Sequence, residues 1–187
     1  MVRVIGLSGY ARSGKDTVAD ILVRDYGFTK LSFAQPMRDV LYALNPRVNF
    51  SEYDELQRLQ DVIDVHGWDN YKETEYGDEI RELMQRLGTE VGRQMFGEAF
   101  WVLAAEGIMM NLLNEGKKVV FTDVRFPNEA EMIGEYNDAQ VWRVRRPGVF
   151  PANGHASETA MDDYEFDAYI DNNGTLEDLE LMLSGHF

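Results

Sequence analysis

The chain of 187 residues carries a formal net charge of −15, is 44% hydrophobic and contains no cysteine. This length and composition predict a folded globular protein, and they exclude disulfide frameworks and thiolate metal sites. A surface this acidic repels nucleic-acid polymers and anionic membranes, so neither is expected as a partner. The first residues lack the layout of a signal peptide, and no apolar run is long enough to span a bilayer. We therefore expect a soluble, cytoplasmic protein with one domain over residues 1–187.

Short apolar runs predict the strands, and helical patterns alternate with them. The strands are expected at 2–8, 30–34, 118–124, 140–145 and 168–172. The first and third runs are nearly continuous in β-branched and aromatic residues, which is typical of central strands covered on both faces. This alternation predicts an α/β fold of three layers, with a doubly wound, five-stranded parallel sheet between helices.

Helix boundaries are indicated by capping residues. Gly27 is expected to end the helix that follows the first strand, and Pro36 lies where the first turn of the next helix should be. The stretch 78–116 predicts two helices with a break near Gly97, and Thr175 opens a capping box at the last helix.

Two segments do not fit the pattern of a sheet. Residues 46–77 are polar and aromatic, and residues 146–163 have the composition of a loop. Each follows an element on the edge where α/β proteins bind their ligands. We interpret 46–77 as a monophosphate-binding or lid insertion and 146–163 as a second lid, with ordered surface insertions as the alternative.

The stretch "GYARSGKDT" between the first strand and the next helix has the pattern G-x-x-x-x-G-K of a phosphate-binding loop. Gly9 and Gly14 allow backbone N–H groups to turn toward phosphates, with Ser13 between them, and the new helix adds its positive end. Lys15 would place its charge against the β- and γ-phosphates of ATP.

The residue after Lys15 is Asp16, where such loops usually have a hydroxyl residue that holds Mg²⁺. A carboxylate next to a polyphosphate is tolerated if a cation lies between them, so we predict that Asp16 binds Mg²⁺. The alternative is an acidic residue that only favours the first turn of the helix. Thr17 is expected at the α-phosphate, and Arg12 is expected to clamp the nucleotide or stabilise the transferring phosphoryl group.

A second acidic candidate lies at the end of the third strand. Asp123 in "TDVRFPNEAE" has the position of a metal-organising carboxylate, and Arg125 is placed to hold an acceptor phosphate. The alternative is an ion pair between the two side chains.

Thirteen of the 18 basic residues are arginine, and several lie inside motifs. Arg38 is a candidate phosphate ligand, although a surface role fits it nearly as well, and Arg93 is a candidate that lies between glycines. Phe100 and Trp101 could stack on a base, although an aromatic pair at a helix start is more often core. Trp68 is a candidate because its stretch is too polar for a core. Further along the chain lie the candidates for charge stabilisation, Arg145 and Arg146, and Glu158, which we interpret as a lid-stabilising or substrate contact.

Several of these stretches together resemble one family, the deoxynucleoside monophosphate kinases of tailed bacteriophages. The most specific resemblance lies in "TDVRFPNEAE" and "LGTEVGR". The others are "SGYARSGKDT", "SFAQPMR", "GWDNYK", "RVRRPG" and "HASE", so that the resemblance covers nearly the whole chain. One departure is Ala11, where some family members have a basic residue.

The resemblance implies a fold like that of nucleoside monophosphate kinases, and transfer of the γ-phosphoryl group of ATP to a deoxynucleoside monophosphate. Family contacts with ATP carry over onto Arg12, Gly14, Lys15, Asp16 and Thr17. Substrate contacts carry over onto Arg38, Arg93, Asp123 and Arg125, and also onto Trp68 and Trp101. Family members are often dimeric, which makes a homodimer possible here.

Two rival functions remain open at this point. One is another small-molecule kinase of the same fold, such as a phosphomevalonate or dephospho-coenzyme A kinase. The other is a non-catalytic module that binds a nucleotide as a switch. The arginines on the acceptor side argue against the second, because a module that only binds one nucleotide needs one phosphate site.

Overall fold

The computed structural model describes residues 2–50, 55–151 and 159–187, and the chain divides into two compact units. The first unit contains Met1–Phe33 and Ala104–Phe187, and the second contains Ala34–Leu103. The phosphate-loop motif therefore belongs to the first unit, and the stretch "LGTEVGR" belongs to the second.

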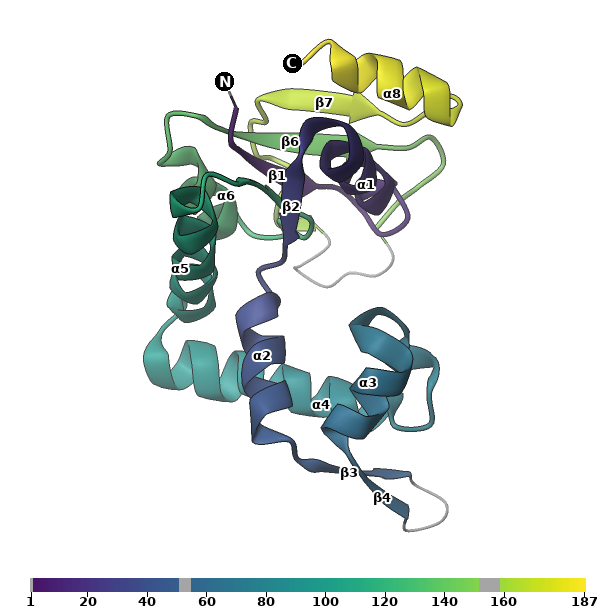
Figure 1. Cartoon of the computed structure of the whole chain (residues 1–187), viewed down its shortest axis with the longest axis vertical. Helices are drawn as coiled ribbons and strands as arrows, with labels where there is room; N and C mark the ends of the chain where they lie inside the picture. The colour runs from purple at the N-terminus through teal and green to yellow at the C-terminus, as the bar shows by residue number, and fades with distance from the viewer. Residues whose placement is uncertain (1, 51–54, 152–158) are drawn as a thin grey trace. The chain divides into compact units, whose positions relative to one another are not determined.

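The first unit is built on a parallel sheet with the strand order β2-β5-β1-β6-β7 (Figure 1). The strands are β1 (Val4–Ser8), β2 (Phe28–Leu31), β5 (Lys118–Phe121), β6 (Ala139–Arg145) and β7 (Ala168–Asp171). The prediction of a five-stranded parallel sheet is confirmed. Because all strands run the same way, their carboxyl ends meet at one edge of the sheet.

Helices cover both faces of this sheet. Ile5 and Leu7 of β1 join a core with α1 (Lys15–Tyr26) and α8 (Leu176–Ser184). Gly6 faces the opposite side, where a Cβ atom would lie 2.6 Å from Ile133 of α6 (Pro127–Gly134). Side chains alternate between the faces of a strand, so these contacts define three layers, as predicted.

Strand β2 begins and ends earlier than predicted. It starts at Phe28, directly after Gly27, which ends α1 in a left-handed conformation as expected. It ends at Leu31 because the next two residues turn their polar groups toward Asp123. The Ser32 hydroxyl donates to Oδ2 of Asp123 at 2.6 Å, and the Phe33 N–H donates to Oδ1 at 2.8 Å.

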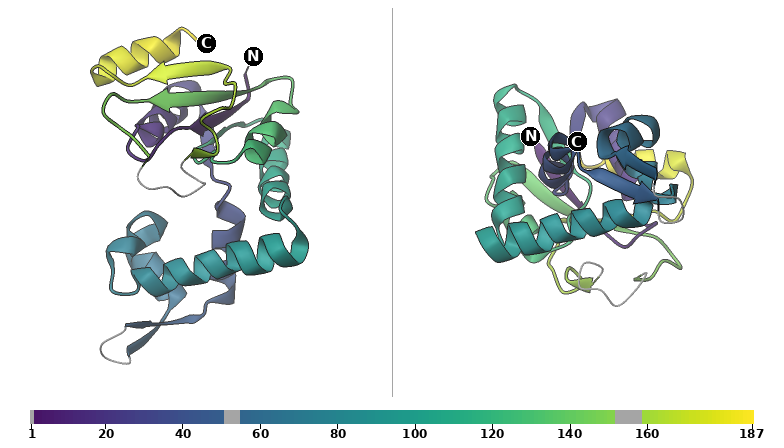
Figure 2. Two further views of the ribbon diagram at one scale, coloured as in Figure 1. Left: turned by 180° about the vertical axis from the view of Figure 1, so that it is seen from behind. Right: turned by 90° about the horizontal axis from the view of Figure 1, so that it is seen from below.

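The second unit is mainly helical (Figure 2). Its elements are α2 (Gln35–Leu44), β3 (Arg47–Phe50), β4 (Glu55–Arg58), α3 (Leu59–Asn70), a 3₁₀ turn (Tyr71–Glu73), α4 (Gly77–Arg86) and the π-helix η2 (Leu87–Phe96). The first turn of α2 contains Pro36, as predicted. Leu41, Val48, Leu59 and Ile80 are buried in a separate core of this unit.

Residues 46–77 contain regular elements that were not predicted, namely an antiparallel hairpin of β3 and β4 followed by α3. The predicted break near Gly97 is confirmed, since Gly97 has a φ of 106° and α5 (Phe100–Asn114) begins three residues later. In the described part of the chain no single helix is long and apolar enough to cross a membrane, although two consecutive helices, Gly77–Phe96 and Phe100–Asn114, meet that test together.

Candidate active site

The phosphate loop spans residues 9–14 and joins β1 directly to α1. Three of its residues have positive φ angles, namely Gly9 at 146°, Arg12 at 66° and Gly14 at 100°. Arg12 is the unusual member, because a left-handed conformation is unfavourable for a residue with a Cβ atom and is found mainly at functional sites. The loop is therefore a strained turn at the carboxyl edge of the sheet.

Lys15 and Ser13 give this turn its polar interior. The Lys15 ammonium donates to the carbonyl oxygens of Gly9 at 2.7 Å and Tyr10 at 2.9 Å, which holds its charge at the loop. The Ser13 side chain is buried, and its Oγ has no hydrogen-bond partner among the residues that the structure describes. An unpaired buried hydroxyl is unfavourable unless a ligand completes it, so the loop has the chemistry of an anion site.

Asp16 and Thr17 lie in the first turn of α1 with exposed side chains. The described residues contain no group of three or more Asp, Glu, His or Cys side chains that could hold a metal ion. Asp16 stays the predicted ligand of Mg²⁺, which proteins commonly bind through one or two carboxylates together with phosphate oxygens and water.

Asn172, just after β7, supports the loop from the side. Its Nδ2 donates to the Ser13 carbonyl at 3.0 Å, and its own N–H donates to the Arg145 carbonyl at 2.8 Å. A Cβ atom on Gly14 would lie 2.2 Å from that Nδ2. The sequence analysis missed Asn172, because its role depends on the register of β7 and not on a motif.

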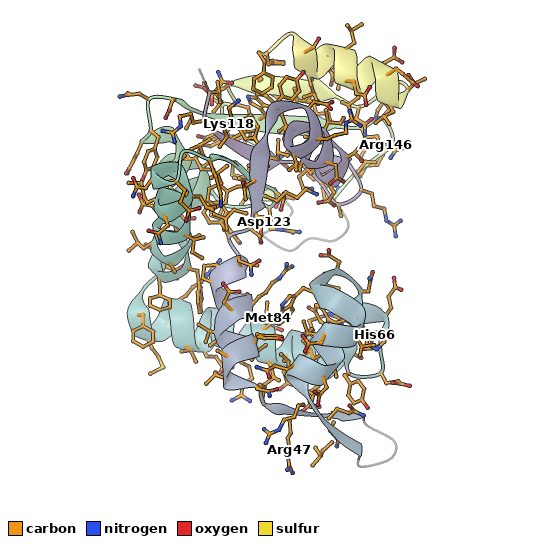
Figure 3. All side chains as sticks on the ribbon, viewed as in Figure 1. Arg47, His66, Met84, Lys118, Asp123 and Arg146 are labelled. Atoms are coloured by element: carbon orange, nitrogen blue, oxygen red, sulfur yellow. The ribbon has the colours of Figure 1, made fainter. Side chains whose placement is uncertain are left out.

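A pocket of about 240 Å³ opens beside the loop. It is lined by Tyr10, Ser13, Arg143, Val144, Arg145, Arg146 and Val149. Arg145 donates two hydrogen bonds to Asp171, at 2.8 and 2.9 Å, and this pairing raises the pKa of Arg145. Arg146 is exposed and makes no ion pair with another described residue, and Figure 3 labels it just beyond β6. Of the two predicted arginines, Arg146 is therefore the more available for binding a phosphate group.

Asp123 and Arg125 follow β5, where Figure 3 labels Asp123. Both oxygens of Asp123 accept the hydrogen bonds from Ser32 and Phe33 described above, so this carboxylate also fixes the exit from β2. Arg125 is exposed, and its N–H donates to the buried carboxylate of Glu129 at 2.7 Å. Glu129 thereby shapes the turn that presents Arg125, a role that the sequence analysis did not assign.

In the second unit, Arg38 on α2 lies over the Trp68 ring, with 5.8 Å between its Cζ and the ring centroid. Trp68 in turn contacts Tyr71 edge-on, at 5.8 Å between centroids. Burial raises the pKa of Tyr71, while Arg38 and Arg81 lower it in part. The Nε of Arg38 is buried and has no hydrogen-bond partner within the described ranges. The structure thus brings together two predicted substrate residues, Arg38 and Trp68. The Arg38 guanidinium still has one nitrogen that no described residue hydrogen-bonds.

Trp101 and Arg93 occupy the other end of this unit. The Trp101 indole donates to the Gly88 carbonyl at 3.0 Å, and its ring fills the space where a side chain on Gly92 would be. Trp101 therefore packs on the π-helix, as in the alternative core interpretation, and its predicted contact with a base stays a prediction. Arg93 is half-buried on the same π-helix, a type of helix that is frequent at functional sites. The remaining predicted substrate residue, Glu158, lies outside the described residues.

The family described as deoxynucleotide monophosphate kinase matches residues 3–77 and 49–182. The chain belongs to the deoxynucleotide monophosphate kinase family. It is 26% identical to a deoxynucleotide monophosphate kinase of Escherichia phage RB69, with 95% of this chain and 96% of the relative covered. It is 28% identical to a deoxynucleoside-5'-monophosphate kinase of Escherichia phage T5, with 72% of each chain covered.

Among solved structures, dephospho-CoA kinase from Campylobacter jejuni is similar, with a TM-score of 0.54, 14% identity and coverage of 100% of this chain and 96% of that chain. This likeness shows that the two chains share a fold. The predicted family and the predicted ATP-dependent kinase of a small nucleotide are confirmed at the level of the deoxynucleotide monophosphate kinase family.

The closeness of Asn172 to Gly14 predicts that the phosphate loop of this chain does not tolerate a methyl group at position 14. In Gly14→Ala the new Cβ atom collides with Asn172. The backbone of residue 14 also has a φ of 100°, which is unfavourable for alanine. A displaced loop loses charge-assisted hydrogen bonds to the phosphates, so ATP binding is expected to weaken about 10- to 100-fold. Isothermal titration calorimetry with ATP measures this loss directly.

Gly27→Ala is the matched control, because Gly27 also has a positive φ, 71°, but a Cβ atom there meets nothing within 4 Å. This variant should lose about 1–2 kcal/mol of stability and keep the ATP affinity of the wild type. Equal ATP affinities of the two alanine variants would contradict the role given to the Gly14–Asn172 contact.

Proposed function

We propose that the first unit binds ATP at the phosphate loop and that Arg38 of the second unit binds the phosphate of the deoxynucleoside monophosphate. The observation that carries this proposal is the buried Nε of Arg38, which lies outside the phosphate loop and has no hydrogen-bond partner among the residues that the structure describes. A guanidinium makes charge-assisted hydrogen bonds to phosphate, and burial strengthens them. A second anion site is what distinguishes a phosphotransferase from a module that binds only ATP.

The donor site is proposed from the geometry of the loop. Backbone N–H groups of the loop and the amino end of α1 attract the phosphates, and Lys15 supplies a positive charge held by the Gly9 and Tyr10 carbonyls. The Ser13 Oγ, which has no hydrogen-bond partner in the described part of the chain, is available to a phosphate oxygen. Arg12 and Thr17 stay predicted contacts of the nucleotide, and both are exposed at this edge.

The acceptor site of the second unit is proposed to include substrate contacts at Trp68 and Arg93, and Arg125 stays a predicted contact of the acceptor phosphate. Arg38 already lies against the Trp68 ring, so a phosphate bound to its guanidinium would have an aromatic surface beside it for the nucleoside. Aromatic side chains bind nucleobases by stacking, a contact that tolerates different bases. Trp101 would act by supporting the π-helix that carries Arg93.

The reaction proposed is an in-line transfer. A phosphate oxygen of the acceptor forms a bond to the γ-phosphorus of ATP, while the bond from that phosphorus to the β,γ-bridging oxygen breaks and ADP leaves with the electron pair. The attacking oxygen is already anionic, so no strong general base is needed. Catalysis then consists of positioning and charge neutralisation by Lys15, Arg12 and Arg146, with Arg145 held by Asp171.

Mg²⁺ is proposed to be held by Asp16 together with phosphate oxygens, where it supplies neutralisation of charge on the β- and γ-phosphates. Asp123 stays a predicted second carboxylate for this ion, with both oxygens already accepting hydrogen bonds. The homodimer and the lack of nucleic-acid and membrane partners likewise stay predictions of the sequence.

The role of Arg38 predicts a selective effect on the acceptor. Arg38→Met keeps the length of the side chain but removes its charge, so the KM for the deoxynucleoside monophosphate should rise about 10- to 100-fold, as expected for a lost charged hydrogen bond. The KM for ATP should stay within about twofold. Steady-state kinetics with each substrate varied in turn separates the two constants.

Arg86→Met is the matched control, because Arg86 is exposed on the same unit and makes a long surface ion pair of 3.6 Å with Glu90. It should leave both KM values unchanged. If Arg38→Met raised the KM for ATP as much as that for the acceptor, Arg38 would not be the acceptor's phosphate ligand.

The metal role of Asp16 is tested on binding and not on turnover. Asp16→Asn should lower the affinity for ATP in the presence of Mg²⁺ about 10- to 100-fold and leave the weaker binding without Mg²⁺ unchanged. Asp20→Asn, one turn later on α1, removes an exposed carboxylate that pairs with Lys30 and should have no such effect. An unchanged Mg²⁺ dependence in Asp16→Asn would leave Asp16 with only its helix-starting role.

A further inference from the structure

Arg143 of β6 is a buried charge that the proposed transfer does not use. Its exposed fraction is 9%, and it pairs in the sheet with Ser8, the last residue of β1 before the phosphate loop. A buried guanidinium is strongly unfavourable unless it is paired and hydrogen-bonded. The position of the Arg143 cation next to the phosphate loop therefore requires an explanation.

Two hydrogen bonds and two rings surround this guanidinium. It donates to Asp162 Oδ1 at 2.7 Å and to the Ser8 hydroxyl at 3.3 Å. Its Cζ lies 4.7 Å from the centroid of the Tyr10 ring and 5.5 Å from that of Phe166. Arg143 thus links the end of β1, the phosphate loop and the segment before β7.

The Tyr10 side chain makes contacts through both its ring and its hydroxyl group. Its ring lies on Arg143, and its hydroxyl donates to the same Asp162 oxygen at 2.9 Å. Burial and the bond to Asp162 raise the pKa of Tyr10. The three side chains close a ring of contacts in which each one touches the other two.

The backbone of Tyr10 is where this ring meets the phosphate loop. The Tyr10 carbonyl accepts hydrogen bonds from Lys15 Nζ at 2.9 Å and from the Ser13 N–H at 3.2 Å. Arg12, between them, is held at a positive φ that the chain would leave if it could relax. Fixing the Tyr10 side chain therefore fixes the turn that carries Lys15 and Ser13.

We propose that Tyr10, Arg143 and Asp162 form a positioning cluster that holds the phosphate loop in its nucleotide-binding conformation. These residues set the affinity for ATP without contacting the reacting atoms. The inference rests on the donor site of the proposed function, since it assigns a role to residues behind that site. The competing explanation is that the cluster only stabilises the fold.

Two single variants and their combination test the cluster. Tyr10→Phe removes the hydroxyl but keeps the ring over Arg143, and Asp162→Asn weakens the acceptor of both bonds. Each should raise the Kd for ATP about three- to tenfold, as expected for one hydrogen bond. The two effects on the Kd should be less than additive in the double variant, because Tyr10→Phe removes one of the two bonds that Asp162→Asn weakens. The KM for the acceptor should not change.

Tyr136→Phe is the matched control, since the Tyr136 hydroxyl donates to Glu106 at 2.7 Å in the same unit but away from the loop. It should lower the Tm about as much as Tyr10→Phe while leaving the Kd for ATP unchanged. If Tyr10→Phe also lowered only the Tm, or if the single effects on the Kd were additive, the cluster would be structural and the proposal would be overturned.

Direct measurement of ATP binding separates this proposal from the proposed function. A wild-type protein that binds ATP but phosphorylates no deoxynucleoside monophosphate would contradict the proposed function and leave the cluster testable by the same variants. A wild-type protein that does not bind ATP would overturn both.

Discussion

The phosphate loop imposes the main constraint on this structure, because it must hold Gly9, Arg12 and Gly14 at positive φ angles between a buried strand and a helix. A loop without supporting contacts would relax from this conformation. The register of the parallel sheet prevents this relaxation, because it places supporting side chains beside the loop. The pairing of β6 with β1 places Arg143 beside Ser8, and the pairing of β7 with β6 places Asn172 where its side chain reaches the Ser13 carbonyl. The loop therefore depends on residues more than 130 positions away in the chain.

Four arginines of this acidic protein differ in how their charge is balanced. Arg143 and Arg145 are paired with Asp162 and Asp171. Arg38 has a buried nitrogen without a partner, and Arg146 is exposed without an ion pair, both within the described part of the chain. Charges that the protein has not neutralised are the ones available to phosphates. This division explains how a protein with a net charge of −15 can bind anionic substrates.

The sequence predicted the central strands, the phosphate loop and most helix ends, because these depend on local signals such as β-branched runs, Gly27 and Pro36. It did not predict the β3–β4 hairpin, whose four-residue strands are too short and polar to show alternation. It also missed Asn172, Glu129 and the contacts of Tyr10 with Arg143. Those roles arise only when strands distant in sequence are brought together, and no spacing in the chain encodes them. Trp101 was assigned by residue type, whereas its packing depends on the π-helix.

The most direct test of the account is a coupled assay of ADP release with ATP and Mg²⁺, run against the four deoxynucleoside monophosphates and their ribose counterparts. We expect ADP release that requires a deoxynucleoside monophosphate and forms one diphosphate product for each ADP. Intact ATP binding with no ADP release on any of these acceptors would contradict the assignment of Arg38 and the phosphate loop to the two substrates of one transfer reaction.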